Sequence, residues 1–201
     1  WIDYGKKRNY VSFFLSDGDN VQWMMQDFAS RYYSVPEAGK VKMGYGLPVS
    51  TLAMMAPAQL GNLMSLQNPC CSVLEMLGGG YYYVDTYSQN NNRRINLKIV
   101  AGRLAAYMRR HNVRLLGVMA MDVKSSAAKE AYQAYVDAND QLEGIIALQY
   151  SPYAGGEGDI FWFTNKAGYD IPVITVKYSI WDRTHEREGC LLYTSPSPRD
   201  A

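Results

Sequence analysis

The sequence predicts an α/β fold of alternating β/α units with a mainly parallel sheet, of the kind found in an incomplete TIM-barrel-like domain. Short runs rich in β-branched and aromatic residues alternate with segments of helical period along the chain. Acidic or glycine-rich turns follow several of these runs. The 201 residues can build one sizeable core, but they are fewer than the roughly 250 of a complete (β/α)8 barrel.

The first unit shows this pattern most clearly. Residues 10–15 (YVSFFL) favour a buried strand, and residues 16–20 (SDGDN) favour a turn. Helical spacing follows, and its apolar face comprises Val21, Met24, Met25, Phe28 and Tyr32. In a parallel α/β fold such a turn opens at the carboxyl end of a strand, where ligands bind. The aspartates of the turn are therefore either part of a site or caps of the helix that follows.

The rest of the chain continues the alternation. Further strands are expected at residues 40–49, 70–77, 114–121, 142–149 and 171–180, with a shorter apolar run at 160–164. Helices are expected at residues 56–67, along a stripe that starts at Leu97 and stops at Asn112, and at 126–139 with Ser125 as cap.

The composition excludes several classes of protein. The net charge is +1 with acids and bases interspersed, so neither a nucleic-acid surface nor an anionic membrane is an expected partner. No apolar run approaches the roughly 20 residues that span a bilayer. Cys70 and Cys71 are adjacent and Cys190 is isolated, which predicts no disulfide framework and no zinc pair. We expect no cofactor, and with only His111 and His185 a bound metal would be oxygen-liganded calcium or magnesium.

The two ends of the chain lead us to expect a fragment. The first residue is Trp1 rather than Met, and residues 189–201 (GCLLYTSPSPRDA) look like the translation of a sequencing adapter at the end of a metagenomic read. We therefore expect a domain over residues 1–188, truncated at both ends, followed by a non-native tail over 189–201.

Carboxylates and aromatic residues gather at one edge of the predicted sheet. Parallel strands bring their carboxyl ends together, and the residues at these ends or in the loops beyond them include Asp17, Asp19, Asn20, Gly78, Gly80, Tyr81, Tyr83, Asp122, Tyr150, Tyr153, Glu157 and Trp181. The amino ends carry no comparable set. Such asymmetry is typical of enzyme-like barrels and doubly wound sheets, although βα loops also need caps and glycines for purely structural reasons.

A tyrosine-rich turn follows the third strand. Residues 78–83 (GGGYYY) fit the pattern G-x-G-Y-x-Y. Glycines permit a tight turn and the close approach of a ligand, and tyrosines offer flat faces with hydroxyl tips that suit sugar rings. The alternative is that these tyrosines cover a core. A GxGxxG nucleotide site is excluded because Tyr83 occupies the place of the third glycine.

With these motifs the chain resembles the C-terminal domain of the GxGYxYP family, glycoside hydrolases found mainly in gut and soil bacteria. The matching features are SDGDN with Trp23, the motif residues Gly78, Gly80, Tyr81 and Tyr83, residues 149–158 (QYSPYAGGEG) and residues 171–181 (IPVITVKYSIW). The resemblance covers about residues 1–188. One departure is that Val84 stands in place of the proline of the motif, so the stiffer turn that a proline would give after Tyr83 is not expected here. The resemblance implies a carbohydrate substrate and an extracytoplasmic location, in the periplasm, on the surface or secreted.

Glycoside hydrolysis usually needs one carboxyl group kept protonated as acid and another ionised as base or nucleophile. Asp17 and Asp19 precede a helix N-terminus, which favours the ionised form and suits the base or nucleophile. Asp122, after an apolar strand, is the first candidate for the acid, and Glu157 is the second. A capping or surface role is open for each.

Six aromatic residues would form the sugar platform: Trp23, Tyr81, Tyr83, Tyr150, Tyr153 and Trp181. Position 23 also fits the core face of its helix. Two other functions are compatible with the sequence. One is a non-catalytic carbohydrate-binding domain, and the other is a metal-dependent hydrolase in which Asp17, Asp19 and Asn20 hold calcium or magnesium. A serine hydrolase is not expected, because no G-x-S-x-G elbow occurs.

Overall fold

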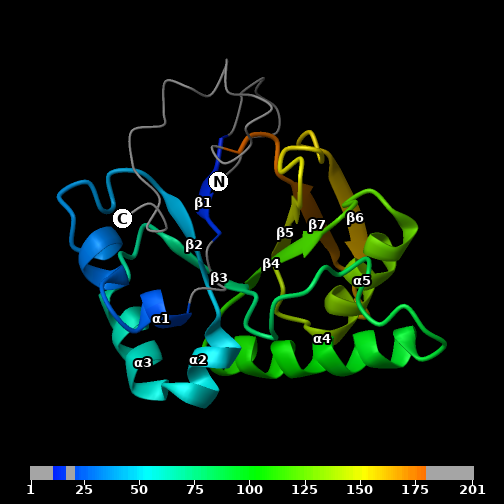
Figure 1. Cartoon of the computed structure of the whole chain (residues 1–201), viewed down its shortest axis with the longest axis horizontal. Coiled ribbons are helices and arrows are strands. Elements are labelled where there is room, and N and C mark those ends of the chain that lie inside the picture. Colours follow the sequence, from blue (N-terminus) through cyan, green and yellow to red (C-terminus); the bar gives the residue numbers. More distant parts are fainter. Residues whose placement is uncertain (1–10, 17–20, 180–201) are drawn as a thin grey trace.

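The structure, a computed structural model, describes residues 11–16 and 21–179. It contains a seven-stranded sheet in the order β1-β2-β3-β4-β5-β7-β6 (Figure 1). The strands are β1 (Phe13–Leu15), β2 (Met43–Leu47), β3 (Ser72–Met76), β4 (Leu115–Ala120), β5 (Gly144–Gln149), β6 (Ile160–Thr164) and β7 (Asp170–Thr175). All neighbouring pairs are parallel except β6 and β7, which are antiparallel.

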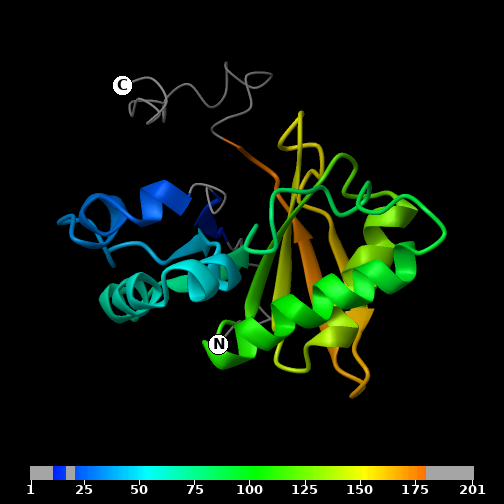
Figure 2. The same ribbon diagram turned by 60° about the horizontal axis from the view of Figure 1, so that its bottom comes forward.

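Helices cover one face of this sheet. They are α1 (Val21–Met24), the π-helical turn η1 (Ala29–Tyr33), α2 (Val49–Met55), α3 (Pro57–Leu66), α4 (Arg93–Arg110) and α5 (Ser126–Ala138). The parallel strands follow one another in chain order, and right-handed crossovers then place every connecting helix on the same side. Figures 1 and 2 show α2 to α5 along this side and the sheet curling like part of a barrel wall. The predicted α/β fold with barrel-type winding is confirmed.

The two faces of the sheet carry separate hydrophobic clusters because side chains alternate along each strand. Val73, Leu116 and Ile145 face the helices and belong to the main core, together with helix residues such as Leu97 and Tyr132. The opposite, helix-free face carries a smaller cluster of Met76, Met119 and Leu148. Loop residues at the carboxyl ends of the strands pack against this smaller cluster, which positions them for a site.

Several helix ends are as the sequence predicts. Ser125 caps α5, and its hydroxyl oxygen accepts a hydrogen bond from the backbone nitrogen of Ala128 at 3.1 Å. Asn112 follows α4 in the left-handed conformation with φ of 53°, a position that favours asparagine or glycine. Pro57 occupies the first turn of α3. These ends depend on local chemistry, which the sequence states directly.

Two expectations about helices and strands are wrong. The strand expected over residues 40–49 ends at Leu47, and α2 begins at Val49 directly after Pro48. The single helix expected from Val21 is split into α1 and η1. In one continuous α-helix Trp23 and Tyr32 would lie on opposite faces, whereas the split brings their ring centroids to 5.0 Å. A regular helix could therefore not have packed both of these aromatic rings into one core.

Over the described residues, no helix combines the length and the apolar character that crossing a membrane requires.

Candidate active site at the carboxyl edge

Four of the predicted site residues, Asp17, Asp19, Asn20 and Trp181, lie outside the described residues. The structure therefore builds the candidate site from the loops that follow β3, β4 and β5.

Tyrosines from two of these loops form one continuous series, which we call the tyrosine platform (Tyr81, Tyr83, Tyr150 and Tyr153). The ring centroids of Tyr81 and Tyr83 are 5.8 Å apart, and those of Tyr83 and Tyr150 are 5.2 Å apart. Tyr150 and Tyr153 follow at 5.5 Å. Tyr81 and Tyr83 come from the loop after β3, and the other two come from the loop after β5. The structure thus brings together four residues that were predicted to bind a sugar.

Alternation within the motif separates the platform from the core. The hydroxyl groups of Tyr81 and Tyr83 lie 3.5 Å apart. Tyr82, between them, instead forms a hydroxyl hydrogen bond of 2.6 Å with Tyr135 of α5. Burial raises the pKa of Tyr82 to about 12, so this ring belongs to the helix-covered core. The first and third tyrosines of the motif are therefore the exposed side of the turn.

The loop that carries the motif is fastened to β4 and to the helices. The backbone nitrogen of Val84 donates to the carbonyl of Met119 at 2.8 Å. A proline, which stands at this position in the motif, has no N–H and could not make this bond. Arg93 of α4 donates to the carbonyl of Val84 at 3.0 Å and pairs with Glu130 of α5 at 2.9 Å. The platform is thus held from β4, α4 and α5 together.

The platform also covers the small cluster on the helix-free face. Tyr83, Tyr150 and Tyr153 are partly buried and pack against Met76, Met119 and Leu148. Tyr81 is 52% exposed. The rings therefore close a hydrophobic cluster and still present aromatic surface at the edge, so the role in a core is observed and the role in sugar binding stays a prediction.

Gly78 and Gly80 shape the turn before the tyrosines. A Cβ on Gly78 would lie well inside van der Waals contact with Glu75 Oε1 and Ser50 Oγ. Gly80 has φ of 109°, which only glycine adopts without strain. The close contacts of Gly78 and the positive φ of Gly80 assign these two glycines to the backbone geometry of the turn.

Asp122, the first candidate for the acid, is not in a dry setting. Its side chain is exposed, and Oδ1 accepts a hydrogen bond from the backbone nitrogen of Lys124 at 2.8 Å. The apolar strand before it suggested burial, but the strand ends at Ala120, so position 122 already lies in the turn. This carboxylate therefore has the geometry of an exposed turn residue.

Glu157, the second candidate, is engaged in an ion pair. Lys124 Nζ lies 2.7 Å from Glu157 Oε2 and 2.8 Å from Asp159 Oδ2. Hydrogen bonds to Asp159 and then Glu157 raise the pKa of Lys124. Glu157 also has φ of 60°, an unusual conformation for a residue other than glycine. The Glu157 carboxylate is therefore held in place by the ammonium group of Lys124.

Sequence reasoning missed two buried carboxyl groups that organise this edge. Asp85 accepts hydrogen bonds from the backbone nitrogens of Met121 at 3.0 Å and Asp122 at 2.9 Å. Glu75, in the middle of the apolar run SVLEM, accepts from the backbone nitrogens of Ser50 and Gly78. An acidic residue inside an apolar strand is the one signal that could have identified Glu75, since buried acids are rare unless they have partners.

Trp23 is not part of the platform. It is 6% exposed and packs edge-on against Phe28 and Tyr32 in the main core. Trp23 therefore occupies the core face of its helix, the alternative that its spacing allowed.

Within residues 11–16 and 21–179, no group of three or more His, Cys, Asp or Glu is arranged to hold a metal ion. The turn proposed for calcium or magnesium, with Asp17, Asp19 and Asn20, lies outside these ranges.

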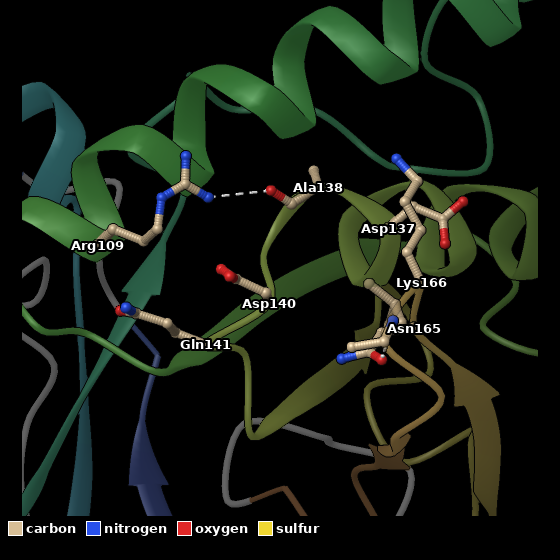
Figure 3. A pocket seen from close by; sticks show the side chains of 9 residues that line it. Arg109, Asp137, Ala138, Asp140, Gln141, Asn165 and Lys166 are labelled. Carbon is tan, nitrogen blue, oxygen red and sulfur yellow. Dashed lines mark hydrogen bonds between the residues drawn. The ribbon is translucent and has the colours of Figure 1, made fainter.

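An open hollow of about 460 Å³ lies at the opposite edge of the sheet (Figure 3). It is lined by the C-terminal ends of α4 and α5, by the loop before β5 and by the hairpin between β6 and β7. Arg109 borders it and donates to the carbonyl of Ala138 at 3.1 Å. Its lining includes none of the predicted site residues, so the hollow and the tyrosine platform are separate features.

The strand order, the helices on one face and the aromatic carboxyl edge define a (β/α) domain of barrel-type winding. The sequence model of the family described as "GxGYxYP putative glycoside hydrolase C-terminal domain" matches residues 7–191. The chain therefore belongs to the GxGYxYP family. No curated protein and no solved structure matches the chain.

Proposed function

We propose that this domain binds a glycan on the tyrosine platform and cleaves its glycosidic bond by carboxylate acid/base chemistry. The observation that carries the proposal is the series of rings from Tyr81 to Tyr153, assembled from two separate strand ends at the carboxyl edge. Membership of the GxGYxYP family, whose description reads "putative glycoside hydrolase", supports it.

The chemistry of the platform fits a carbohydrate. Pyranose rings have flat apolar faces bordered by hydroxyl groups, and tyrosines combine an aromatic face with a polar tip. A partly exposed ring, such as that of Tyr83, can contact a sugar while its other contacts keep it in place.

We assign the base or nucleophile to Asp17 or Asp19 and the acid to Asp122, with Glu157 as the second choice. Asp122 is exposed at the same edge as the platform, and Lys124 links it to Glu157 through the backbone and the ammonium group. The separation of the two working carboxyl groups, about 5 Å or roughly 6.5 to 9.5 Å, would decide between retention and inversion.

The test is to find a glycan that the full chain binds on a glycan array, and then to assay its hydrolysis by product release. Asp17→Asn, Asp19→Asn, Asp122→Asn and Glu157→Gln are compared with Asp137→Asn, which lies at the opposite edge. Loss of a working carboxyl group should reduce turnover at least about 100-fold while glycan binding remains. Unchanged turnover in a folded variant removes that residue from the catalytic set.

A second candidate function is glycan binding without cleavage. It is favoured by one observation: neither Asp122, which is exposed, nor Glu157, which is paired with Lys124, is in the dry setting that keeps a carboxyl group protonated. Glycan binding without any product over long incubation would establish it.

A further inference from the structure

We infer that Glu75 is the positioning residue of the tyrosine platform: its carboxyl group holds the turn at Gly78 from which Tyr81 and Tyr83 project. This inference rests on the proposed function, because the platform is what that function uses.

The carboxyl group of Glu75 joins two elements by hydrogen bonds to their backbones. Oε1 accepts from the nitrogen of Gly78 at 2.9 Å, and Oε2 accepts from the nitrogen of Ser50 in α2 at 2.8 Å. The hydroxyl group of Thr51, also in α2, donates to the carbonyl of Gly78. Both polar backbone groups of Gly78 are therefore held, one by β3 and the other by α2.

Gly78 and Glu75 fit each other. The space that a side chain on residue 78 would take is filled by Glu75 Oε1 and by Ser50 Oγ. The turn begins at Leu77 and ends at Gly80, both of which have positive φ. The nitrogen of Gly80 donates to the carbonyl of Leu77 at 3.0 Å. Fixing Gly78 therefore fixes the direction in which the chain leaves toward Tyr81.

The direction of the Glu75 side chain excludes contact with a sugar on the platform. Residues 73 and 75 share one face of β3, and Val73 belongs to the core beneath the helices. Met76 faces the other side, where it packs in the cluster that Tyr83 covers. Glu75 is fully buried, so it acts on the platform through Gly78 and not by touching a ligand.

The surroundings of Glu75 make its ionisation measurable. Burial raises the pKa of this carboxyl group to about 8, although the hydrogen bonds from Ser50 and Gly78 oppose the rise. Its neighbours across the sheet are Leu47 on β2 and Leu116 on β4, which carry no charge. From the loop after β3, the titratable group that senses Glu75 is the Tyr82 hydroxyl, whose own pKa is far above neutral.

A selective NMR experiment on the full chain tests the link. The sequence contains three Leu-Gly pairs, at Gly61, Gly78 and Gly117. Labelling with carbonyl-¹³C leucine and ¹⁵N glycine therefore gives one amide signal for each of these glycines. We expect the Gly78 signal to shift with a midpoint near pH 8 and the Gly61 and Gly117 signals to shift much less, because of these three glycines only Gly78 donates a hydrogen bond to the carboxyl group of Glu75.

The same titration in Glu75→Gln should lose the midpoint, and Glu143→Gln, an exposed change at the opposite edge, should keep it. The glycan selected by array for the wild-type chain should bind at least about tenfold more weakly to Glu75→Gln and unchanged to Glu143→Gln.

Three results would overturn the inference. The first is a Gly78 signal that does not shift between pH 6 and about pH 9 in the wild type, a result that needs no variant and stands even if Glu75→Gln fails to fold. The second is the same titration midpoint in a folded Glu75→Gln chain. The third is an unchanged glycan affinity in a Glu75→Gln chain that has lost the midpoint. If the wild type binds no glycan, the proposed function fails, and the Gly78 titration still decides whether Glu75 holds the turn.

Discussion

Tyr83 and Tyr150 lie in different loops, after β3 and after β5, yet their ring centroids are 5.2 Å apart. The strand between them is β4, and the link runs across its end: residue 83 forms an isolated parallel bridge with Met119, and the nitrogen of Tyr150 donates to the carbonyl of Ala120 at 2.8 Å. Two loops thus extend the hydrogen bonding of the sheet beyond its regular strands, and this extension brings the rings together.

The platform predicts that single tyrosine losses weaken glycan binding. Tyr83→Ala and Tyr150→Ala should each lower affinity for the array-selected glycan roughly tenfold, about 1.4 kcal/mol, because each removes aromatic contact area. Tyr169→Ala, which removes a 68% exposed ring from the hairpin between β6 and β7, is the matched control. Isothermal calorimetry measures all three. Equal losses at Tyr169 and Tyr83 would argue against a localised platform.

We expect alanine to have opposite effects on stability at Gly78, in the turn, and at Gly61, in α3. Gly78→Ala should lower the free energy of unfolding by more than about 2 kcal/mol, because its Cβ would displace the buried Glu75 carboxyl group. Gly61→Ala, inside α3 with open space around it, should raise that free energy by roughly 0.5 to 1 kcal/mol. Urea denaturation gives both values. An unchanged free energy of unfolding in Gly78→Ala would mean that Glu75 and Gly78 are not closely packed.

Glu75 predicts a pH dependence of stability with a definite sign. Its pKa in the folded chain is raised from 4.5 to about 8, so between these values the folded state holds a proton that the unfolded state has lost. Its contribution is therefore fully present below pH 4.5 and declines as pH rises through 8, by up to about 1.4 kcal/mol per pH unit.

Urea midpoints of the wild type and Glu75→Gln, measured across this range, isolate the effect from that of other groups. The difference between the two chains should shrink as pH rises, because only the wild type carries the titrating carboxyl group. A difference that stays constant with pH would show that Glu75 does not titrate in this window.

Asp85 predicts a loss of order at the end of β4. Asp85→Ala removes the acceptor for the backbone nitrogens of Met121 and Asp122, and it should cost about 2 kcal/mol of stability. Hydrogen exchange of residues 119–124 should accelerate more than that of α5. Asp140→Ala, at an exposed position near the opposite edge, serves as the control and should leave both measurements unchanged.

Much of the fold follows from local sequence. The apolar run around Val118 has the pattern of a buried strand, and the apolar stripe from Leu97 to Met108 has the period of a helix. The cap at Ser125 depends only on neighbouring residues. The split between α1 and η1 could not be predicted in the same way. It depends on Trp23 and Tyr32 meeting Phe28 in a core whose shape no single segment determines.

The same contrast divides the site. The outer tyrosines of the motif could be singled out as candidates because glycines followed by tyrosines at a strand end combine a tight turn with aromatic faces and hydroxyl tips. Glu75 and Asp85 could not be, since each has a partner far along the chain, the backbone nitrogen of Ser50 for Glu75 and that of Met121 for Asp85. Lys124 was missed for a related reason: its carboxylate partner Glu157 becomes a neighbour only when β4 and β5 pair.

The most direct test of the central claim is a crystal structure of the chain with an array-selected glycan bound. We predict a sugar ring in contact with Tyr83 and Tyr150 at the carboxyl edge, with Asp122 on the same side. A glycan seated instead in the hollow beside Arg109 and Lys166, with the tyrosine platform empty, would contradict the account.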